Sequence, residues 1–372
     1  MDRRQFLLSI LGGGAILAGA GKVLGSKEGD DTFGSDAGTE GRSVRHGEPG
    51  SRIKIVGLGD GGGDMLSTLR WLPLTEAQCA DYLYINTDHF SLELLTDRGT
   101  DARKLFIGKT VTAGRGSGGD SLLGRQAALD SGEAIRSALR GAGMVVIMAG
   151  LGGGTGSGAA PVIAGIARDL GALSVSVVTT PFAFEGAMRN SRALDALADL
   201  RATSDGVICV QNDRVLGGHR GHPLSNVFAT ASCMVGTLAN DLACSVAPPS
   251  GIALDAADLR ALFREGSEVY AGTGDGRLSQ GGLGAAARTA SQFPLITVGV
   301  LSAASSALVV VSGGETMRLA DVDAALTKIK KRMPDDADIY FAPILDPKMH
   351  DECRVTIYAI EGRAGSRKTW KA

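Results

Sequence analysis

Residues 150–158 read GLGGGTGSG, a run of glycines that carries two hydroxyl side chains, Thr155 and Ser157. Glycine lets successive backbone N–H groups turn toward one anion, and the hydroxyls can add hydrogen bonds to it. An apolar run precedes the glycines and a helical pattern follows, so a helix N-terminus faces the same anion. This context favours a phosphate-binding loop over a merely flexible glycine loop.

A second glycine motif, GLGDGG at residues 57–62, directly follows a short apolar run. Its spacing fits the G-x-G-x-x-G pattern of dinucleotide-binding dehydrogenases, but a lone match of this kind is weak evidence. A Rossmann dehydrogenase is therefore the less supported alternative.

Two carboxylates, Asp255 and Asp258, lie three residues apart at the start of a predicted helix, so they share a face. Carboxylates in that arrangement can orient and polarise a water molecule that attacks a bound phosphate. The alternative is that Asp255 only caps the helix, which is a common role for Asp.

The elements that must position these residues follow a repeated order of strand, glycine-rich turn and helix from residue 52 onward. Residues 144–149 are continuously apolar, as expected for a strand buried on both faces of a parallel sheet. The alternation predicts a doubly wound α/β domain, in which phosphates bind at the carboxyl ends of strands. The predicted elements are strands at 53–57, 82–85, 144–149, 174–178 and 207–210, a turn at 59–63, and helices from 65 to 71 and from 158 to 170.

The pattern changes after residue 259. Strands are predicted at 308–311, 339–343 and 354–360, with one clear helix at 320–332, which indicates a smaller α+β domain. A long helix at 225–246 connects the two parts. We therefore predict a mostly parallel nucleotide-binding domain at 52–224, a connecting helix and acidic loop at 225–258, and a C-terminal α+β domain at 259–362.

The composition limits the classes of function. The chain has 372 residues, 44% of them hydrophobic, enough for about two domains with sizeable cores. A net charge of −2 gives no electrostatic basis for nucleic acid as the main partner. The five cysteines have neither metal-ligand nor disulfide spacing, so no metal site is predicted from them. Thiols in a reducing compartment are the favoured interpretation.

Residues 1–26 have the layout of an export signal or a membrane anchor. Arg3 and Arg4 precede an uncharged run at 5–21, which contains the small-residue sequence AGA at 18–20. The start resembles a twin-arginine signal, although the apolar run is shorter than the ~20 residues of a spanning helix. A cleaved signal, an uncleaved anchor and a fortuitous apolar tail all remain open. Residues 27–51 are predicted to be a flexible linker, and residues 363–372 a basic tail.

In their order along the chain, these motifs resemble those of the tubulin/FtsZ superfamily. The segment GGGTGSG at 152–158 resembles the signature loop of tubulin and FtsZ, and no Gly-Lys-Ser/Thr follows it as in a Walker loop. The likeness spans residues 52–361. Further matching motifs are IKIVGLG at 53–59, NTD at 86–88, residues 114–119, TPFAFEG at 180–186 with Arg189, NDR at 212–214, DP at 346–347 and DECRVT at 351–356.

The resemblance implies a protein that binds GTP or GDP, with Mg²⁺. It implies that Thr155 lies against the γ-phosphate and that Phe228 stacks on the base, although core packing is the alternative for Phe228. The residues assigned in this way are Gly61, Gly62, Gly153, Gly154, Thr155 and Gly156 around the phosphates, Glu185 and Arg189 at the ribose, Asn212 at the base or ribose, and Phe228.

In this family, hydrolysis is completed where the acidic loop of one subunit meets the nucleotide of the next, and the resemblance gives that role to Asp255 and Asp258. A contact between two different surfaces continues into a filament unless it closes into a ring. We expect a GTPase that polymerises for cell division or membrane remodelling, at the cytoplasmic face of a membrane, with residues 1–26 as a candidate tether. The alternatives are a nucleotide-binding scaffold with weak or lost hydrolysis and a protein exported by the twin-arginine signal.

Four positions depart from the FtsZ pattern. Asp60 replaces a glycine of the first loop, where a carboxylate repels phosphate unless it points away or a cation lies there. Asp64 replaces an Asn. Cys233 stands where FtsZ has the Asp that reads guanine, and a thiol is a weak hydrogen-bonding partner, so guanine selectivity is open. Ala253 replaces an Asn of the acidic loop, which leaves the hydrolysis rate open.

Overall fold

The computed structural model describes residues 52–69, 80–95, 102–217, 224–246, 256–263, 267–292 and 298–361, together with residues 254 and 296. The predicted segments 1–26, 27–51 and 363–372 lie outside the described residues, as do Ala253 and Asp255.

The described strands form one sheet in the order β3-β2-β1-β4-β5-β6-β7-β10-β8-β9. Strands β1 to β6 are parallel, and β7 extends them by pairing in parallel with the beginning of β6. β10 pairs antiparallel with β7 and β8, and β9 pairs in parallel with β8. The strands are β1 (Arg52–Leu58), β2 (Asp81–Asn86), β3 (Arg103–Phe106), β4 (Ala142–Gly150), β5 (Leu173–Thr180), β6 (Gly206–Gln211), β7 (Ser267–Arg277), β8 (Ala304–Gly313), β9 (Asp338–Leu345) and β10 (Glu352–Glu361).

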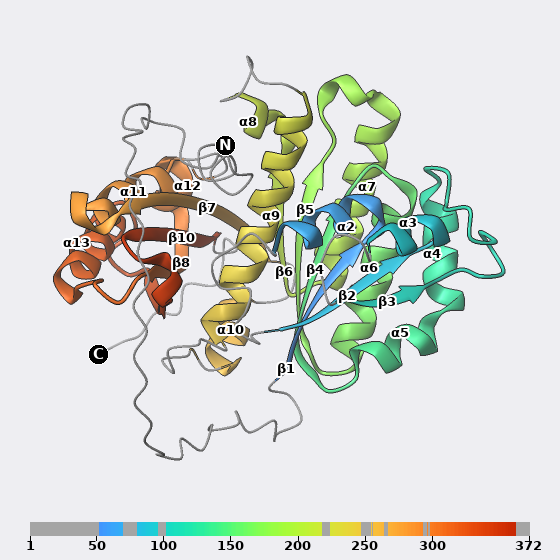
Figure 1. Ribbon diagram of the computed structural model, residues 1–372, viewed down its shortest axis with the longest axis horizontal. Helices are drawn as coiled ribbons and strands as arrows, with labels where there is room; N and C mark the ends of the chain where they lie inside the picture. Colours follow the sequence, from blue (N-terminus) through green and yellow to red (C-terminus); the bar gives the residue numbers. More distant parts are fainter. Residues whose placement is uncertain are drawn as a thin grey trace, which may run out of the picture.

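Helices cover both faces of the parallel strands (Figure 1). Helices α2 and α9 contribute to the core on one face, and α4 to α7 contribute to the core on the other. The helices are α2 (Gly59–Thr68), α3 (His89–Leu94), α4 (Ser121–Asp130), α5 (Gly132–Leu139), α6 (Gly154–Asp169), α7 (Ala187–Thr203), α8 (Asn212–Gly217), α9 (Leu224–Val246), α10 (Ala256–Leu262), α11 (Gly282–Ala290), α12 (Val298–Ala303) and α13 (Leu319–Lys330), with 3-10 turns η4 (Ala183–Glu185), η5 (Leu278–Gln280) and η6 (Pro347–Met349).

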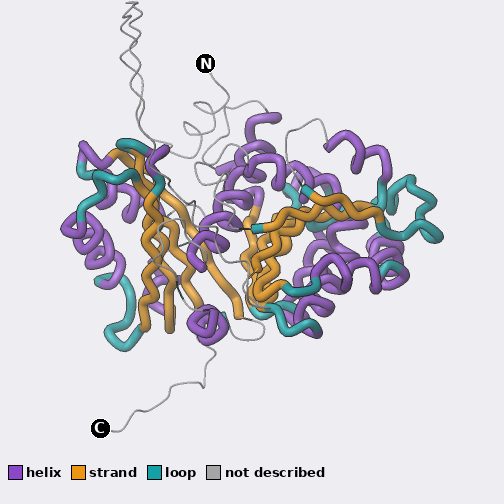
Figure 2. The backbone as a smooth tube through the Cα atoms, turned by 60° about the horizontal axis from the view of Figure 1, so that its bottom comes forward, coloured by secondary structure: helices purple, strands orange, loops and turns teal. Residues whose placement is uncertain are grey.

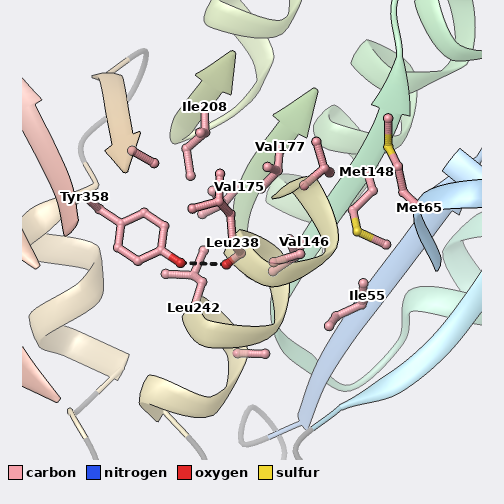
Figure 3. Packing of buried hydrophobic residues seen from close by; sticks show 14 of the residues in the cluster. Ile55, Met65, Val146, Met148, Val175, Val177, Ile208, Leu238, Leu242 and Tyr358 are labelled. Carbon is pink, nitrogen blue, oxygen red and sulfur yellow. Dashed lines mark hydrogen bonds between the residues drawn. The ribbon is translucent and has the colours of Figure 1, made fainter. Parts of the chain in front are cut away.

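Helix α9 lies between the parallel strands and the C-terminal strands (Figure 1). Figure 2 shows helices between the two groups of strands. Its Leu238 and Leu242 are fully buried in one core with Val175 of β5 and Tyr358 of β10 (Figure 3). The Tyr358 hydroxyl donates to the Leu238 carbonyl at 2.6 Å. The predicted fold class is confirmed, while the boundaries 52–224, 225–258 and 259–362 stay a proposal.

Among the described residues, one segment is long and apolar enough to cross a membrane, Asn226–Val246 of α9, with a mean hydropathy of 1.3. Within this segment, 83% of the apolar window is buried in the protein, as in a core helix.

Three predictions about local structure are wrong. The turn predicted at 59–63 is the first part of α2, and α6 begins at Gly154 rather than at residue 158. Glycine has a low helix propensity, but α2 rests directly on the sheet, where a Cβ at Gly62 would lie 2.6 Å from the Met148 carbonyl oxygen. Close packing therefore requires glycine inside the helix. The C-terminal part also contains α11 and α12 besides the single predicted helix, α13.

Candidate functional site

The glycine-rich loop joins the carboxyl end of β4 to the N-terminus of α6, at the edge of the sheet where the parallel strands end. Gly152 has a φ of 90°, and a Cβ there would lie 2.6 Å from Pro181 Cγ. The Leu151 N–H donates to the Thr179 carbonyl at 2.9 Å, which ties the loop to the end of β5. The loop is therefore held by its neighbours in one shape.

Thr155 links three loops through its hydroxyl. Its Oγ1 lies 2.6 Å from Thr87 Oγ1, after β2, and 3.1 Å from Ser117 Oγ, before α4. Ser157 Oγ instead accepts from the Gly152 N–H at 2.8 Å, within its own loop. Thr155 thus joins the ends of different elements, while Ser157 fixes the shape of the glycine loop.

The glycines assigned to the phosphates differ in their surroundings. A Cβ at Gly154 would lie 2.6 Å from the Asp120 carbonyl oxygen, and one at Gly156 would overlap the Gly150 carbonyl oxygen. By contrast, a Cβ at Gly153 would meet no atom within 4 Å, so the space on that side of Gly153 is open. A Cβ at Gly61 would lie 3.5 Å from the Gly150 nitrogen, which places the start of α2 against the same loop.

A second group of predicted site residues surrounds Phe182, after β5. Arg189 Nη1 donates to Glu185 Oε2 at 2.7 Å, and the other Glu185 oxygen accepts from the Phe182 N–H at 2.9 Å. The Phe228 ring on α9 meets the Phe182 ring edge to face at 5.0 Å, and the Phe184 ring stacks on Phe182 at 4.9 Å. Phe228 is 41% exposed, so part of its ring is free to stack on a flat ligand.

Asn212 begins α8 beside this group and is 6% exposed. Its Oδ1 is buried and has no hydrogen-bond partner in the described part of the protein. A buried polar atom without a partner is unfavourable by about 1–3 kcal/mol, so this acceptor fits a ligand N–H or O–H. The neighbouring Asp213 accepts from the Ala183 N–H at 3.1 Å, which joins α8 to η4.

The residues around Thr155 and the residues around Phe182 form one site. A Cβ at Gly152 would lie 2.9 Å from the Arg189 carbonyl oxygen, so the glycine loop touches the beginning of α7. Arg192, one turn further along α7, donates to the Gly119 carbonyl at 2.6 Å and to the Gly152 carbonyl at 3.3 Å. Sequence reasoning missed Arg192 and gave Thr87 and Ser117 no role. The spacing of Arg192 from Arg189, i to i+3 on one helix face, is the signal that could have found it.

Asp258, one of the two predicted catalytic carboxylates, lies away from this site. Asp255 is outside the described residues, and Asp258 is exposed on α10. Arg260 of α10 donates to the Gly171 carbonyl at 2.8 Å, just before β5 begins. Helix α10 therefore lies at the amino edge of the parallel strands, opposite the glycine loop. The nine residues of β4 separate the two edges by about 26 Å at ~3.3 Å per residue.

Cys233 is 1% exposed on α9 and interacts electrostatically with Arg354 of β10. Asp60 and Asp64 are exposed on α2. Among the described residues, no group of three or more His, Cys, Asp or Glu side chains could hold a metal ion. A Mg²⁺ ion here would need oxygen ligands from a bound phosphate, which is how proteins usually hold it.

A family model described as "Tubulin/FtsZ family, GTPase domain" matches residues 52–218, and one described as "FtsZ family, C-terminal domain" matches residues 269–361. Cell division protein FtsZ of Mycoplasmopsis pulmonis is 31% identical over 320 residues, which cover 86% of this chain and 79% of that protein. The chain belongs to the tubulin/FtsZ family.

Solved structures of the family have the same fold. An empty FtsZ dimer from M. jannaschii is similar with a TM-score of 0.76 and 29% identity, over 85% of this chain and 89% of that chain. CetZ2 from Haloferax volcanii, solved as a GTPγS-bound protofilament, is similar with a TM-score of 0.67 over 83% of this chain and 93% of that chain. At 22% identity, the CetZ2 likeness shows the fold alone.

Proposed function

We propose that this FtsZ-family chain binds GTP where β1, β4 and β5 end, hydrolyses it with Mg²⁺, and polymerises head to tail with copies of itself. The observation that carries the proposal is the meeting of three loops at Thr155, whose hydroxyl lies within hydrogen-bond distance of both Thr87 and Ser117. Phosphates at this point would face the N-terminus of the 16-residue helix α6, which favours negative charge.

Each of the remaining predicted residues is assigned to one part of the nucleotide. In the proposal, Gly61, Gly62 and the loop glycines surround the phosphates. The Glu185–Arg189 pair takes the ribose hydroxyls, the free oxygen of Asn212 accepts from the base or ribose, and Phe228 stacks on the base. The orphaned Asn212 oxygen and the half-exposed Phe228 ring support these roles, because both have an unused surface for a ligand.

Hydrolysis is proposed to need two chains. Asp258 lies at the opposite edge of the sheet from Thr155, about 26 Å away along a strand, so it cannot reach the nucleotide of its own chain. In a head-to-tail arrangement, α10 of one copy faces the glycine loop of the next, where Asp255 and Asp258 would orient the attacking water. Such an interface continues into a filament unless it closes.

The proposed role is in cell division or a cytoskeleton, in the cytoplasm. The relative named as a cell division protein supports the division role, and the FtsZ dimer supports self-association. For residues 1–26 we propose attachment of the filament to a membrane. Deleting them is expected to abolish cosedimentation of the chain with lipid vesicles. Unchanged cosedimentation would contradict the attachment and leave the GTPase proposal standing.

One observation favours a second candidate, a nucleotide-binding scaffold with weak guanine selectivity and weak hydrolysis. The Cys233 thiol is buried and lies near Arg354, in place of a carboxylate that could accept from the guanine edge. A scaffold would bind nucleotides and assemble without turning them over.

The test uses the full-length chain with Mg²⁺ and GTP, GDP or ATP, and follows light scattering and phosphate release together. Scattering that rises with GTP and falls as phosphate appears is the expected result. Binding without phosphate release would favour the scaffold, and no response to any nucleotide would contradict both candidates.

A further inference from the structure

Asp60 brings a carboxylate into the candidate phosphate site. It is the second residue of α2 and is exposed, at the point where β1 ends. The residues on either side touch the glycine loop: a Cβ at Gly59 would lie 3.5 Å from the Gly156 nitrogen, and one at Gly61 would lie 3.5 Å from the Gly150 nitrogen. Asp60 is therefore within one side-chain length of the groups proposed to hold phosphate.

One oxygen of this carboxylate accepts a hydrogen bond from a buried side chain. Asn86, buried at the end of β2, donates from Nδ2 to Asp60 Oδ1 at 2.8 Å. The same Nδ2 lies 2.7 Å from the Tyr84 hydroxyl, and Asn86 Oδ1 accepts from the Thr87 N–H at 2.8 Å. Because both ends of the Asn86 amide are engaged, the amide offers Asp60 a donor in a defined position.

The charge of Asp60 is not neutralised within the described protein. No described basic side chain forms an ion pair with Asp60. Two arginines of the site have other partners, since Arg192 bonds two loop carbonyls and Arg189 bonds Glu185. A carboxylate this close to a polyphosphate repels it, and a cation between the two reverses the sign of the interaction.

A hard divalent cation fits this place. Mg²⁺ takes one or two protein carboxylates together with phosphate oxygens and water, and Asp60 offers one carboxylate oxygen that Asn86 does not use. We propose that Asp60 anchors a divalent cation against the nucleotide phosphates, so that the site takes the metal–nucleotide complex in preference to the free nucleotide. The inference rests on the proposed nucleotide site and adds a residue that selects the metal-bound form.

The experiment measures the affinity of the full-length chain for a fluorescent guanine nucleotide, with Mg²⁺ and with a chelator. Wild type is expected to bind at least about tenfold more weakly in the chelator, since the phosphates then meet an unscreened carboxylate. Asp60→Asn keeps an oxygen for Asn86 and removes the charge. It is expected to bind more tightly than wild type in the chelator and to lose most of its dependence on metal.

Asp81→Asn is the matched control. Asp81 is exposed at the amino end of β2, so its replacement changes the net charge equally without touching the site, and its metal dependence should equal that of wild type. A direct readout is the electron paramagnetic resonance signal of Mn²⁺, which should be immobilised by wild type with bound GDP and much less by Asp60→Asn.

The outcomes separate the two proposals. If wild type binds no nucleotide, the nucleotide site and this inference both fail. If wild type and Asp60→Asn bind nucleotide with the same metal dependence and immobilise Mn²⁺ equally, the inference alone fails.

Discussion

At the scale of single residues, the site depends most on the hydroxyl of Thr155. Its Oγ1 is close to both Thr87 Oγ1 and Ser117 Oγ, so one small group holds three loops in register. The proposed γ-phosphate would add a charged partner to the same hydroxyl, and hydrogen bonds to charged groups contribute about 1.5–3 kcal/mol.

Thr155→Val tests this role, because valine keeps the shape of threonine and removes the hydroxyl. We expect nucleotide affinity to fall by about tenfold to a hundredfold, measured by equilibrium titration of the full-length chain with a fluorescent guanine nucleotide. Thr155→Ser, which keeps the hydroxyl, should bind within about threefold of wild type. Equal affinity in the valine variant would show that the hydroxyl does not contact the ligand.

The sequence motifs predicted which loops form the site, but they did not predict which side chains contact one another there. The motifs that carry Thr87, Ser117 and Asn86 were visible in the sequence, but only the folded chain shows that Thr87 and Ser117 meet the Thr155 hydroxyl and that Asn86 bonds Asp60. Side-chain pairing across loops depends on the ends of different strands meeting at one edge. A linear pattern carries no information about those distances.

At the scale of elements, helix α6 carries two glycines in different environments. A Cβ at Gly158 would overlap the Ser121 carbonyl oxygen and lie 2.5 Å from the Arg125 nitrogen of α4. A Cβ at Gly165 would meet nothing within 4 Å. Gly158 therefore allows α4 and α6 to approach closely, whereas Gly165 has no such role.

Gly158→Ala is expected to lower the free energy of unfolding by about 1–3 kcal/mol, because the backbone of α4 must move to accommodate the methyl group. Gly165→Ala on the same helix is expected to raise it by up to about 1 kcal/mol, since alanine favours the helix. Urea denaturation followed by circular dichroism measures both, and equal effects of the two substitutions would contradict the packing account.

Helix α9 meets the C-terminal strands through a buried ionic cluster. Asp241 of α9 is 1% exposed and accepts from the Thr356 hydroxyl at 2.6 Å. Arg354 of β10, also buried, donates to Asp275 of β7 at 2.7 Å. Burial raises the pKa of Asp241 above its ordinary value, with a further rise from Asp275, while Arg354 and the Thr356 and Asn240 hydrogen bonds lower it in part.

The raised pKa predicts a pH dependence with a defined sign. The folded state holds the Asp241 proton more tightly than the unfolded chain, whose pKa is about 3.9. The contribution of Asp241 to stability is therefore greatest below that value and is lost as the pH rises through the folded pKa. Asp241→Asn keeps the acceptor for Thr356, so its stability relative to wild type should increase as the pH rises from about 4 to neutrality.

Urea denaturation of both proteins across this pH range measures the difference. Asp195→Asn, which removes an exposed carboxylate on α7, should run parallel to wild type. If Asp241→Asn also runs parallel to wild type, burial does not control the titration of this carboxylate.

Sequence patterns predicted some helices and strands and missed others. Strand β4 was predicted because a continuous apolar run marks a buried strand. Strand β7 was not predicted, because glycines interrupt its apolar pattern. A Cβ at Gly276 would lie 2.6 Å from the Gly282 carbonyl oxygen, so these glycines let α11 pack directly on the strand. The reason for the glycines is tertiary packing, which the local pattern does not reveal.

At the scale of the whole molecule, the predicted phosphate-binding loop and the predicted catalytic residue Asp258 lie at opposite edges of one sheet. The glycine loop follows the carboxyl end of β4, and α10 with Asp258 lies beside the amino end of β5. This separation is a property of the fold, and a single chain cannot bring the two together. We therefore propose that hydrolysis is completed between chains.

The most direct test is the rate of phosphate release per chain as a function of protein concentration, with GTP and Mg²⁺ in excess. We predict almost no release at low concentration and a rate per chain that rises steeply once filaments form. Asp258→Asn should bind GTP like wild type and lose this rise. A rate per chain that is the same at all concentrations would contradict hydrolysis between chains, because each chain would then complete the reaction alone.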